Sequence, residues 1–199
     1  MTTGAVSAPT ASSPPSAPST PSGPTALAAM PTPIEALPAR NLDKRELREL
    51  VDRLAAAPEL WRDQVAFSGD RRHYASLHRS EHVDVWLLCW ADGNDTGWHD
   101  HDVSSGAVRV VEGAITEYNL RVGGAHAESR MDEDTSFSFG PDHIHRLTPA
   151  VDGSVSIHAY SPPLWRMGQY SFSDDGVLRR VSVSYAEELR PIGPEPVAC

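Results

Sequence analysis

Hydrophobic and polar positions follow three different patterns along the chain of 199 residues. Residues 1 to 40 hold mainly Ala, Pro, Ser and Thr, and only Glu35 and Arg40 are charged. Such a segment buries too little apolar surface to offset the entropy cost of ordering, so we predict a disordered tail. Helical and then strand-like spacing follows, which predicts one folded domain at residues 41 to 190 and a short C-terminal tail at 191 to 199.

The second pattern predicts helix. Asn41 is a candidate N-cap, and charged residues separate the apolar positions that come after it. These positions are three or four residues apart and are Leu47, Leu50, Val51 and Leu54. The segment APELWRD, residues 57 to 63, predicts a further short helix.

The third pattern predicts strands. Val83, Val85, Leu87 and Cys89 alternate with Asp84, Trp86, Leu88 and Trp90. Later β-rich runs are AVRVVEG, AITEYNLRV, TSFSFG, HRLTPA, SVSIHAYS, QYSFS and VLRRVSVSY, separated by turn signals such as ADGND, VDG and SDDG. Many short strands behind one or two short N-terminal helices indicate an all-β fold, a β-barrel or jelly roll.

Composition narrows the classes of partner. The net charge is −10 and no run of Lys or Arg occurs, so nucleic acid and anionic membrane are poor partners. The longest apolar run, residues 85 to 91, is too short to span a bilayer. Cys89 and Cys199 do not form a disulfide framework, and no secretion signal is visible. We therefore expect a cytoplasmic protein that is a monomer or weak oligomer.

Histidines carry the candidate chemistry. His99 and His101 are two residues apart, so in a strand their side chains point to the same face. A third histidine from a neighbouring strand would complete a facial set of three nitrogens, a good site for Fe, Zn, Cu or Ni. Three neutral ligands leave the charge of a divalent ion uncompensated, which favours binding of a thiolate or hydroxide. Spacing alone leaves both His143 and His145 open as the third ligand.

Two motifs carry a resemblance to a known family. The segment GNDTGWHDHDVSSGAVRVVEG, residues 93 to 113, resembles the first cupin motif, with Gly106 where that motif has Glu. The segment SVSIHAYSPPL, residues 154 to 164, resembles a Ser-x-His-x-Tyr-Ser-Pro-Pro signature. From about residue 72 to 165 the chain thus resembles the cysteine dioxygenase (thiol dioxygenase) family of the cupin superfamily. Gly106 resembles the bacterial type, which lacks a Cys–Tyr cross-link at this position.

The resemblance implies specific roles. A cupin β-barrel would hold Fe(II) on His99, His101 and His145. Tyr160 would place its hydroxyl beside the substrate and oxygen, while His158 and Ser156 would fix the direction of that hydroxyl. Cys89 is expected to be a buried apolar residue and not a catalytic one. Trp86, Trp90 and Trp98 are expected to serve packing.

The chain departs from the family's pattern at the arginine that binds the substrate carboxylate. Bacterial relatives often have Tyr-x-Arg before the first apolar run, and here Ser76 stands at the Arg position. Arg72 lies nearby, and Arg166 follows the Ser-Pro-Pro segment, where some 3-mercaptopropionate-type relatives use an Arg. A bidentate guanidinium fits a carboxylate, and the sequence leaves both arginines open.

The resemblance implies an Fe(II)-dependent dioxygenase that adds both atoms of O2 to the sulfur of a small thiol. L-Cysteine to cysteine sulfinic acid, within cysteine metabolism and the taurine/sulfinate pathway, is the first expectation, and 3-mercaptopropionate or another small carboxylated thiol is the second. Two other classes stay open: a zinc hydrolase or lyase that activates water, and a non-catalytic metal-binding cupin. The Ser-x-His-x-Tyr signature argues against the hydrolase, and the intact ligand set argues against a binding-only cupin.

Overall fold

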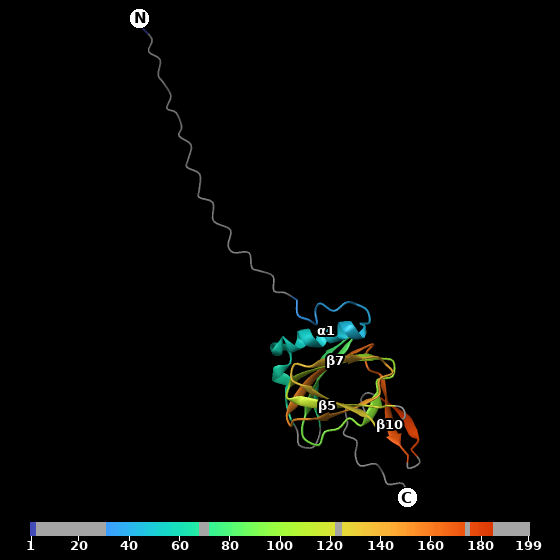
Figure 1. Ribbon diagram of the computed structural model, residues 1–199. Helices are drawn as coiled ribbons and strands as arrows, with labels where there is room; N and C mark the ends of the chain where they lie inside the picture. Colours follow the sequence, from blue (N-terminus) through green and yellow to red (C-terminus); the bar gives the residue numbers. More distant parts are fainter. Residues whose placement is uncertain (3–30, 68–71, 122–124, 174–175, 185–199) are drawn as a thin grey trace. The chain divides into compact units, whose positions relative to one another are not determined.

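The computed structural model describes residues 1–2, 31–67, 72–121, 125–173 and 176–184 (Figure 1). The predicted tail is therefore described only at its two ends, and the predicted tail at 191 to 199 lies outside the described residues. One compact unit begins at Pro31, earlier than the predicted boundary at Asn41. Ile34 and Leu37 pack against the hydrophobic core, so the last part of the predicted tail belongs to the folded unit.

The described chain contains one α-helix, two short 3-10 helices and eleven strands. Their bounds are α1 Lys44–Ala55, η1 Pro58–Leu60, η2 Arg62–Gln64, β1 His73–Arg79, β2 Asp84–Trp90, β3 Trp98–Asp100, β4 Ser105–Glu112, β5 Ala114–Asn119, β6 Ala127–Asp132, β7 Ser136–Phe139, β8 His145–Pro149, β9 Ser154–Ser161, β10 Arg166–Phe172 and β11 Leu178–Ser184. No helix among these residues has the length and apolar character needed to cross a membrane.

Helix α1 begins two residues later than predicted. Asp43, not Asn41, is the N-cap: its carboxylate accepts from the backbone N–H groups of Arg45 and Glu46. Glu46 in turn accepts from the backbone N–H of Asp43, which completes a capping box. Asp43 and Glu46 together satisfy three backbone amide donors, whereas the residue three positions after Asn41 is Lys44, which cannot accept in this way.

Two antiparallel sheets form the β-barrel and confirm the predicted all-β cupin fold. The five-stranded sheet has the order β1-β2-β9-β4-β7, and the six-stranded sheet has the order β11-β10-β3-β8-β5-β6. Neighbours in both sheets are mostly distant in sequence, as in a jelly roll. Figure 1 shows α1 beside β7, on the five-stranded side of the barrel and away from β5 and β10.

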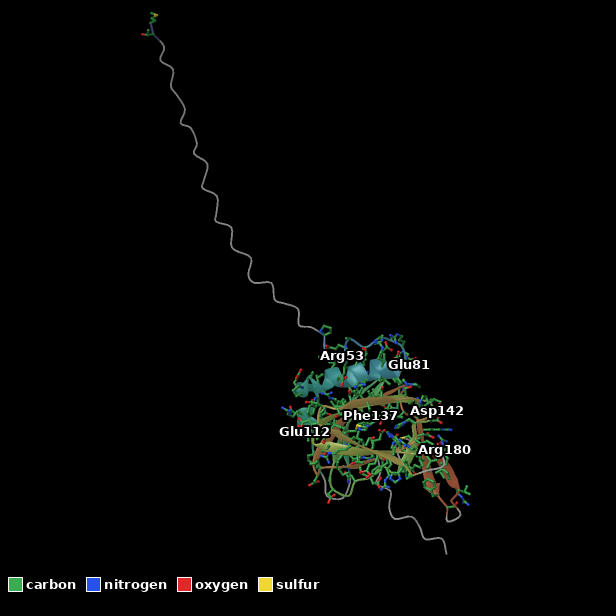
Figure 2. The ribbon with its side chains drawn as sticks, viewed as in Figure 1. Arg53, Glu81, Glu112, Phe137, Asp142 and Arg180 are labelled. Carbon is green, nitrogen blue, oxygen red and sulfur yellow. The ribbon has the colours of Figure 1, made fainter. Side chains whose placement is uncertain are left out.

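The alternation predicted for β2 separates two layers of core. Val85, Leu87 and Cys89 pack against the apolar face of α1 in an outer core cluster. Leu88 and Trp90 belong to an inner cluster between the two sheets, against which Phe137 packs (Figure 2). The five-stranded sheet is therefore covered on both faces, by α1 on one and by the inner cluster on the other, which explains why all eight residues of β9 are buried.

Candidate metal centre

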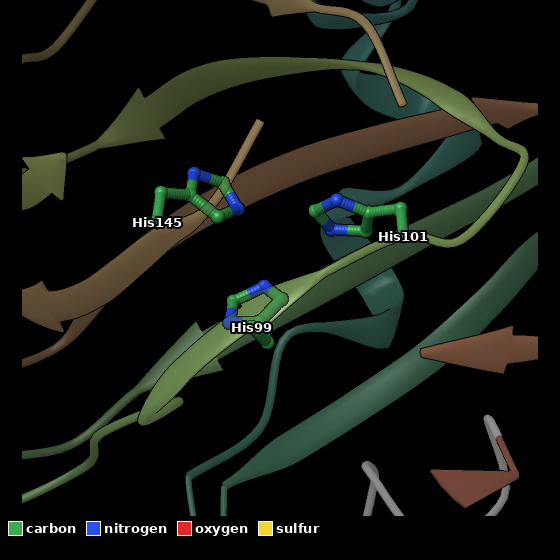
Figure 3. A group of neighbouring side chains, drawn as sticks. All are labelled: His99, His101 and His145. Carbon is green, nitrogen blue, oxygen red and sulfur yellow. The ribbon is translucent and has the colours of Figure 1, made fainter. Parts of the chain in front are cut away.

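Three histidines converge inside the barrel. His99 lies in β3, His101 follows that strand directly, and His145 opens β8 as the cross-strand partner of His99. Their ring centroids are 4.6 to 5.2 Å apart, and one nitrogen from each lies within 4.8 Å of the others. Figure 3 shows the three rings turned toward a common centre. The three side chains predicted as ligands are thus brought together.

The hydrogen bonding of these rings fits a divalent metal. All three side chains are buried, yet both ring nitrogens of His101 and Nε2 of His145 have no hydrogen-bond partner among the described residues. His99 donates from Nδ1 to the carbonyl of Gly97 at 3.0 Å, which leaves Nε2 as its lone-pair nitrogen. Buried nitrogens without partners are costly unless something else satisfies them, and a metal ion would do so.

Burial keeps the rings of His101 and His145 neutral, as metal ligands must be. Burial lowers the pKa of His101 well below its ordinary value, and repulsion from His99 and His145 adds to the effect. Burial likewise lowers the pKa of His145 to about 3, although a hydrogen bond to Glu117 opposes the shift. A neutral imidazole offers a lone pair to a metal at physiological pH.

His143, the alternative third ligand, is placed differently from His145. Its Nε2 lies 2.8 Å from Oε1 of Glu117, and its side chain is 29% exposed. Its ring stacks on Phe139 with centroids 5.1 Å apart. Two possible metal-binding groups therefore share His145. One consists of His99, His101 and His145, and the other of Glu117, His143 and His145.

A hydrogen-bonded chain runs along one face of β9. Trp90 donates from its indole N–H to Oγ of Ser156 at 2.8 Å. Ser156 Oγ lies 2.8 Å from Nε2 of His158, and His158 Nδ1 lies 3.1 Å from the hydroxyl of Tyr160. Residues two apart in a strand share a face, so the signature Ser-x-His-x-Tyr builds this chain directly. Trp90, which the sequence predicts to serve packing, is thus also a member of this hydrogen-bonded chain.

The end of this chain meets the metal centre. The ring of Tyr160 stacks on His101 with centroids 5.1 Å apart. Burial lowers the pKa of His158 well below its ordinary value, and the positive charge of Arg72 lowers it further. A neutral His158 that accepts from Ser156 at Nε2 donates from Nδ1 to the Tyr160 oxygen, which leaves the Tyr160 O–H to donate elsewhere.

A cavity opens beside the three histidines. Its polar lining comes from Arg72, Thr96, His99, His158 and Tyr160. Its apolar lining comes from Trp86, Leu88, Leu147, Leu164 and Met167. Trp86 therefore contacts the cavity in addition to packing, which differs from the role expected of it. A small ligand in this cavity would meet a cation, the metal site and an apolar wall together.

The two candidate arginines occupy different places. Arg72 lines the cavity, and its guanidinium carbon lies 5.0 Å from the centroid of the Trp90 ring. Arg166, at the start of β10, is exposed and is not among the residues that line the cavity. Ser76 pairs with Trp86 across β1 and β2 but does not line the cavity either. Only Arg72 of these three lies where it can face a ligand beside the metal centre.

The residues around Gly106 leave no room for a side chain at this position. A Cβ built on Gly106 would overlap the ring of Phe139 and would lie 3.1 Å from Cδ1 of Tyr160. The Phe139 ring also packs against His101, with centroids 4.7 Å apart, and against His145. Phe139 therefore fills the space that a larger residue at 106 would need, and no thioether to Tyr160 can form from glycine.

Asp100 lies between two of the candidate ligands and faces away from them. It accepts hydrogen bonds from Arg180 Nε at 2.7 Å, from Tyr170 and from the backbone N–H of Gly168 at 3.0 Å. Burial alone would raise the pKa of Asp100, but the bonds from Arg180 and Tyr170 outweigh it and hold the pKa well below its ordinary value. This cluster fixes β3, and with it His99, to the β10–β11 hairpin that carries Arg180 (Figure 2).

The chain is similar to a known protein family and to several solved structures. The family model described as cysteine dioxygenase type I matches residues 22–173. Among solved structures, an uncharacterized conserved protein with a double-stranded beta-helix domain from Klebsiella pneumoniae is 9% identical, with a TM-score of 0.45, over 60% of this chain and 91% of that chain. An rmlC-like cupin protein from Desulfovibrio desulfuricans is 18% identical, with a TM-score of 0.42, over 50% of this chain and 90% of that chain.

The family model spans most of the chain and includes all three histidines and the Ser156-His158-Tyr160 segment. The two structures are too distant to add to that assignment. The chain belongs to the cysteine dioxygenase type I family.

Proposed function

We propose that this protein is an Fe(II)-dependent thiol dioxygenase acting on a small thiol that carries a carboxylate, with L-cysteine as the first substrate to test. The observation that carries the proposal is the shared cavity of Arg72 and His99, next to Tyr160. The cavity thus offers a cation, Arg72, for a carboxylate and borders the three-histidine group at His99, where a metal-bound thiolate would lie. The reaction is balanced as thiol plus O2 giving a sulfinic acid, with both oxygen atoms on sulfur.

His99, His101 and His145 would hold the iron, since one nitrogen of each lies within 4.8 Å of the others and no Asp or Glu of the described residues belongs to that group. Bound Fe(II) would supply the redox chemistry that joins the thiol sulfur to dioxygen. The chain itself provides orientation: Arg72 receives the carboxylate, and the apolar wall around Leu147 and Leu164 keeps bulk water from the reacting sulfur.

Tyr160 is proposed to donate a hydrogen bond to the reacting oxygen or sulfur. The chain Trp90–Ser156–His158 fixes the direction of its hydroxyl, because each donor in it already has an acceptor. A donor held in advance stabilises charge that develops in the transition state without reorganising.

A second substrate is favoured by a specific feature of the cavity. No Asp or Glu is among its lining residues, so the α-ammonium group of cysteine finds no acidic partner in the described lining. 3-Mercaptopropionate has the same thiol and carboxylate but no ammonium group to desolvate. The lining therefore supports 3-mercaptopropionate as the alternative to L-cysteine.

The test is oxygen uptake by protein reconstituted anaerobically with Fe(II), using L-cysteine, 3-mercaptopropionate and cysteamine, with products identified by mass. We expect a sulfinic acid from at least one carboxylated thiol and little turnover of cysteamine, which lacks the carboxylate. Arg72→Met should lower kcat/KM about 10- to 100-fold, the cost of losing a charge-assisted hydrogen bond. Arg166→Met is the matched control and should leave kcat/KM unchanged.

Failure of both carboxylated thiols in iron-loaded protein would refute the proposed reaction and favour a metal-binding cupin without this activity. Efficient turnover of cysteamine, or an Arg166 effect larger than the Arg72 effect, would refute the assignment of Arg72.

A further inference from the structure

Glu117 is a charged side chain inside the barrel that the proposed reaction does not use. It lies in β5, two residues after the buried Ile115, so the alternation of the strand turns its carboxylate toward the interior. Its side chain is 6% exposed. A carboxylate is rarely buried to this extent unless it is paired, so its partners indicate its role.

Two histidines are hydrogen-bond partners of Glu117, and the side chain of Asn119 is a third. Oε1 of Glu117 lies 2.9 Å from Nδ1 of His145 and 2.8 Å from Nε2 of His143. His145 presents its other nitrogen, Nε2, to His99 and His101, and that atom has no hydrogen-bond partner among the described residues. The carboxylate and the metal-facing nitrogen are thus on opposite sides of one imidazole ring.

An ionised carboxylate only accepts hydrogen bonds, so the shared proton must sit on Nδ1 of His145. That tautomer leaves a lone pair on Nε2, which is the form a metal needs. The same bond fixes the rotation of the ring, and the negative charge offsets part of the positive charge that an ion on three neutral ligands retains.

We propose that Glu117 is a positioning residue for the metal centre: it fixes the tautomer and orientation of His145, and His143 holds Glu117 in place by its own hydrogen bond. The inference rests on the proposed metal site but not on the dioxygenase reaction. His99 obtains the equivalent orientation from the carbonyl of Gly97, which carries no net charge. Glu117 is therefore the only carboxylate hydrogen-bonded to any of the three ligand rings among the described residues.

The experiment measures metal affinity without thiol or oxygen. Co(II) is the probe, followed by its visible absorption in competition with a chelator, for the wild type and for Glu117→Leu, Glu117→Gln and His143→Ala. Glu117→Leu removes the acceptor and should weaken Co(II) binding about 10- to 100-fold, as loss of such an outer carboxylate does. Glu117→Gln keeps an acceptor oxygen but removes the charge, so its loss should be smaller and the Co(II) spectrum should stay close to that of the wild type.

Glu128→Gln is the matched control, because Glu128 is an exposed glutamate on the adjacent strand β6. Its Co(II) affinity should equal that of the wild type. His143→Ala should cause a loss smaller than that of Glu117→Leu, since His145 keeps its acceptor. This variant also provides a test if Glu117→Leu does not fold, because His143 is partly exposed.

Wild-type affinity and an unchanged Co(II) spectrum in both Glu117 variants would overturn the inference. Equal losses in Glu128→Gln would overturn it as well. Wild-type protein that binds Co(II) and Fe(II) but oxidises no thiol would refute the proposed reaction alone, so the two failures can be told apart.

Discussion

The two faces of strand β2, whose residues alternate in sequence, pack in different environments. Val85, Leu87 and Cys89 point outward and pack with α1 in a hydrophobic cluster. Trp86, Leu88 and Trp90 point inward, where buried polar groups from β9 lie among them. Ser156 and His158 in β9 are as inaccessible as the leucines under the helix.

The difference shows what each layer demands. The outer layer needs apolar volume, and residues of similar size can replace one another there. In the inner layer, hydrogen bonds offset the cost of burying polar groups, as in the chain from Trp90 to Tyr160. Buried nitrogens without a protein partner occur where His101 and His145 meet, which is the place for a metal ion. Changes in the outer layer should therefore affect stability, and changes in the inner layer should affect chemistry.

The largest effect is expected from His101→Ala, which removes one of the three proposed metal ligands from the inner layer. Iron analysis of protein reconstituted with Fe(II) should show the loss of stoichiometric metal, with no oxygen uptake and a retained fold. His126→Ala, at an exposed histidine that contacts the rings of Trp98 and Tyr118, should retain full iron. Full iron occupancy in the His101 variant would refute the ligand assignment.

Leu50→Ala makes the opposite change, in the outer layer. Leu50 lies on the buried face of α1 and is fully buried, so the cavity left behind should lower the free energy of unfolding by about 2–5 kcal/mol. Urea denaturation of the metal-free protein measures this loss. The folded variant should bind iron as the wild type does, and a large loss of metal affinity would show that the two layers are not separate.

Tyr160→Phe removes one hydroxyl at the end of the inner hydrogen-bonded chain. Turnover should fall about 10²-fold, the usual cost of losing one prepositioned donor, while iron content stays at the wild-type level. Tyr118→Phe serves as control, because Tyr118 is a β5 residue whose ring contacts His126 and Arg146. Unchanged turnover in the Tyr160 variant would exclude its hydroxyl from the mechanism.

Gly106→Ala should have the smallest effect. The added methyl group meets the Phe139 ring, and overpacking of this kind costs about 1–3 kcal/mol. Thermal unfolding measures the cost, and the double variant Gly106→Ala with Phe139→Leu should recover part of it. A single variant as stable as the wild type would mean that Phe139 moves aside freely.

The fold was largely predictable because local pattern and tertiary structure agree. The alternation in β2 correctly separates an outer from an inner set, and the spacing of Leu47, Leu50, Val51 and Leu54 correctly marks the buried face of α1. The histidine pairs could be found because residues two apart in a strand share a face. The predicted start of the helix was wrong. The reciprocal hydrogen bonds of Asp43 and Glu46 set the N-cap at Asp43, and the prediction of Asn41 did not take them into account.

Other parts of the site depend on contacts between distant segments. Spacing could not choose between His143 and His145, since the choice depends on which of them pairs with His99 of the neighbouring strand β3. Arg72 could not be preferred to Arg166 until its position over Trp90 was known. Glu117 did leave a signal that was missed: a charged residue at an inward position of the strand AITEYN, two residues after a buried Ile115.

The dioxygenase proposal requires that Fe(II) held by the three histidines supports the addition of both atoms of one O2 molecule to a thiol sulfur. The most direct measurement is mass analysis of the product formed under ¹⁸O2 by Fe(II)-loaded protein with L-cysteine and with 3-mercaptopropionate. We expect the wild type to convert at least one of the two thiols to a sulfinic acid that carries two ¹⁸O atoms. The His101→Ala variant should form no such product. A product with no ¹⁸O, a disulfide alone, or the same labelled product from the variant would contradict the proposal.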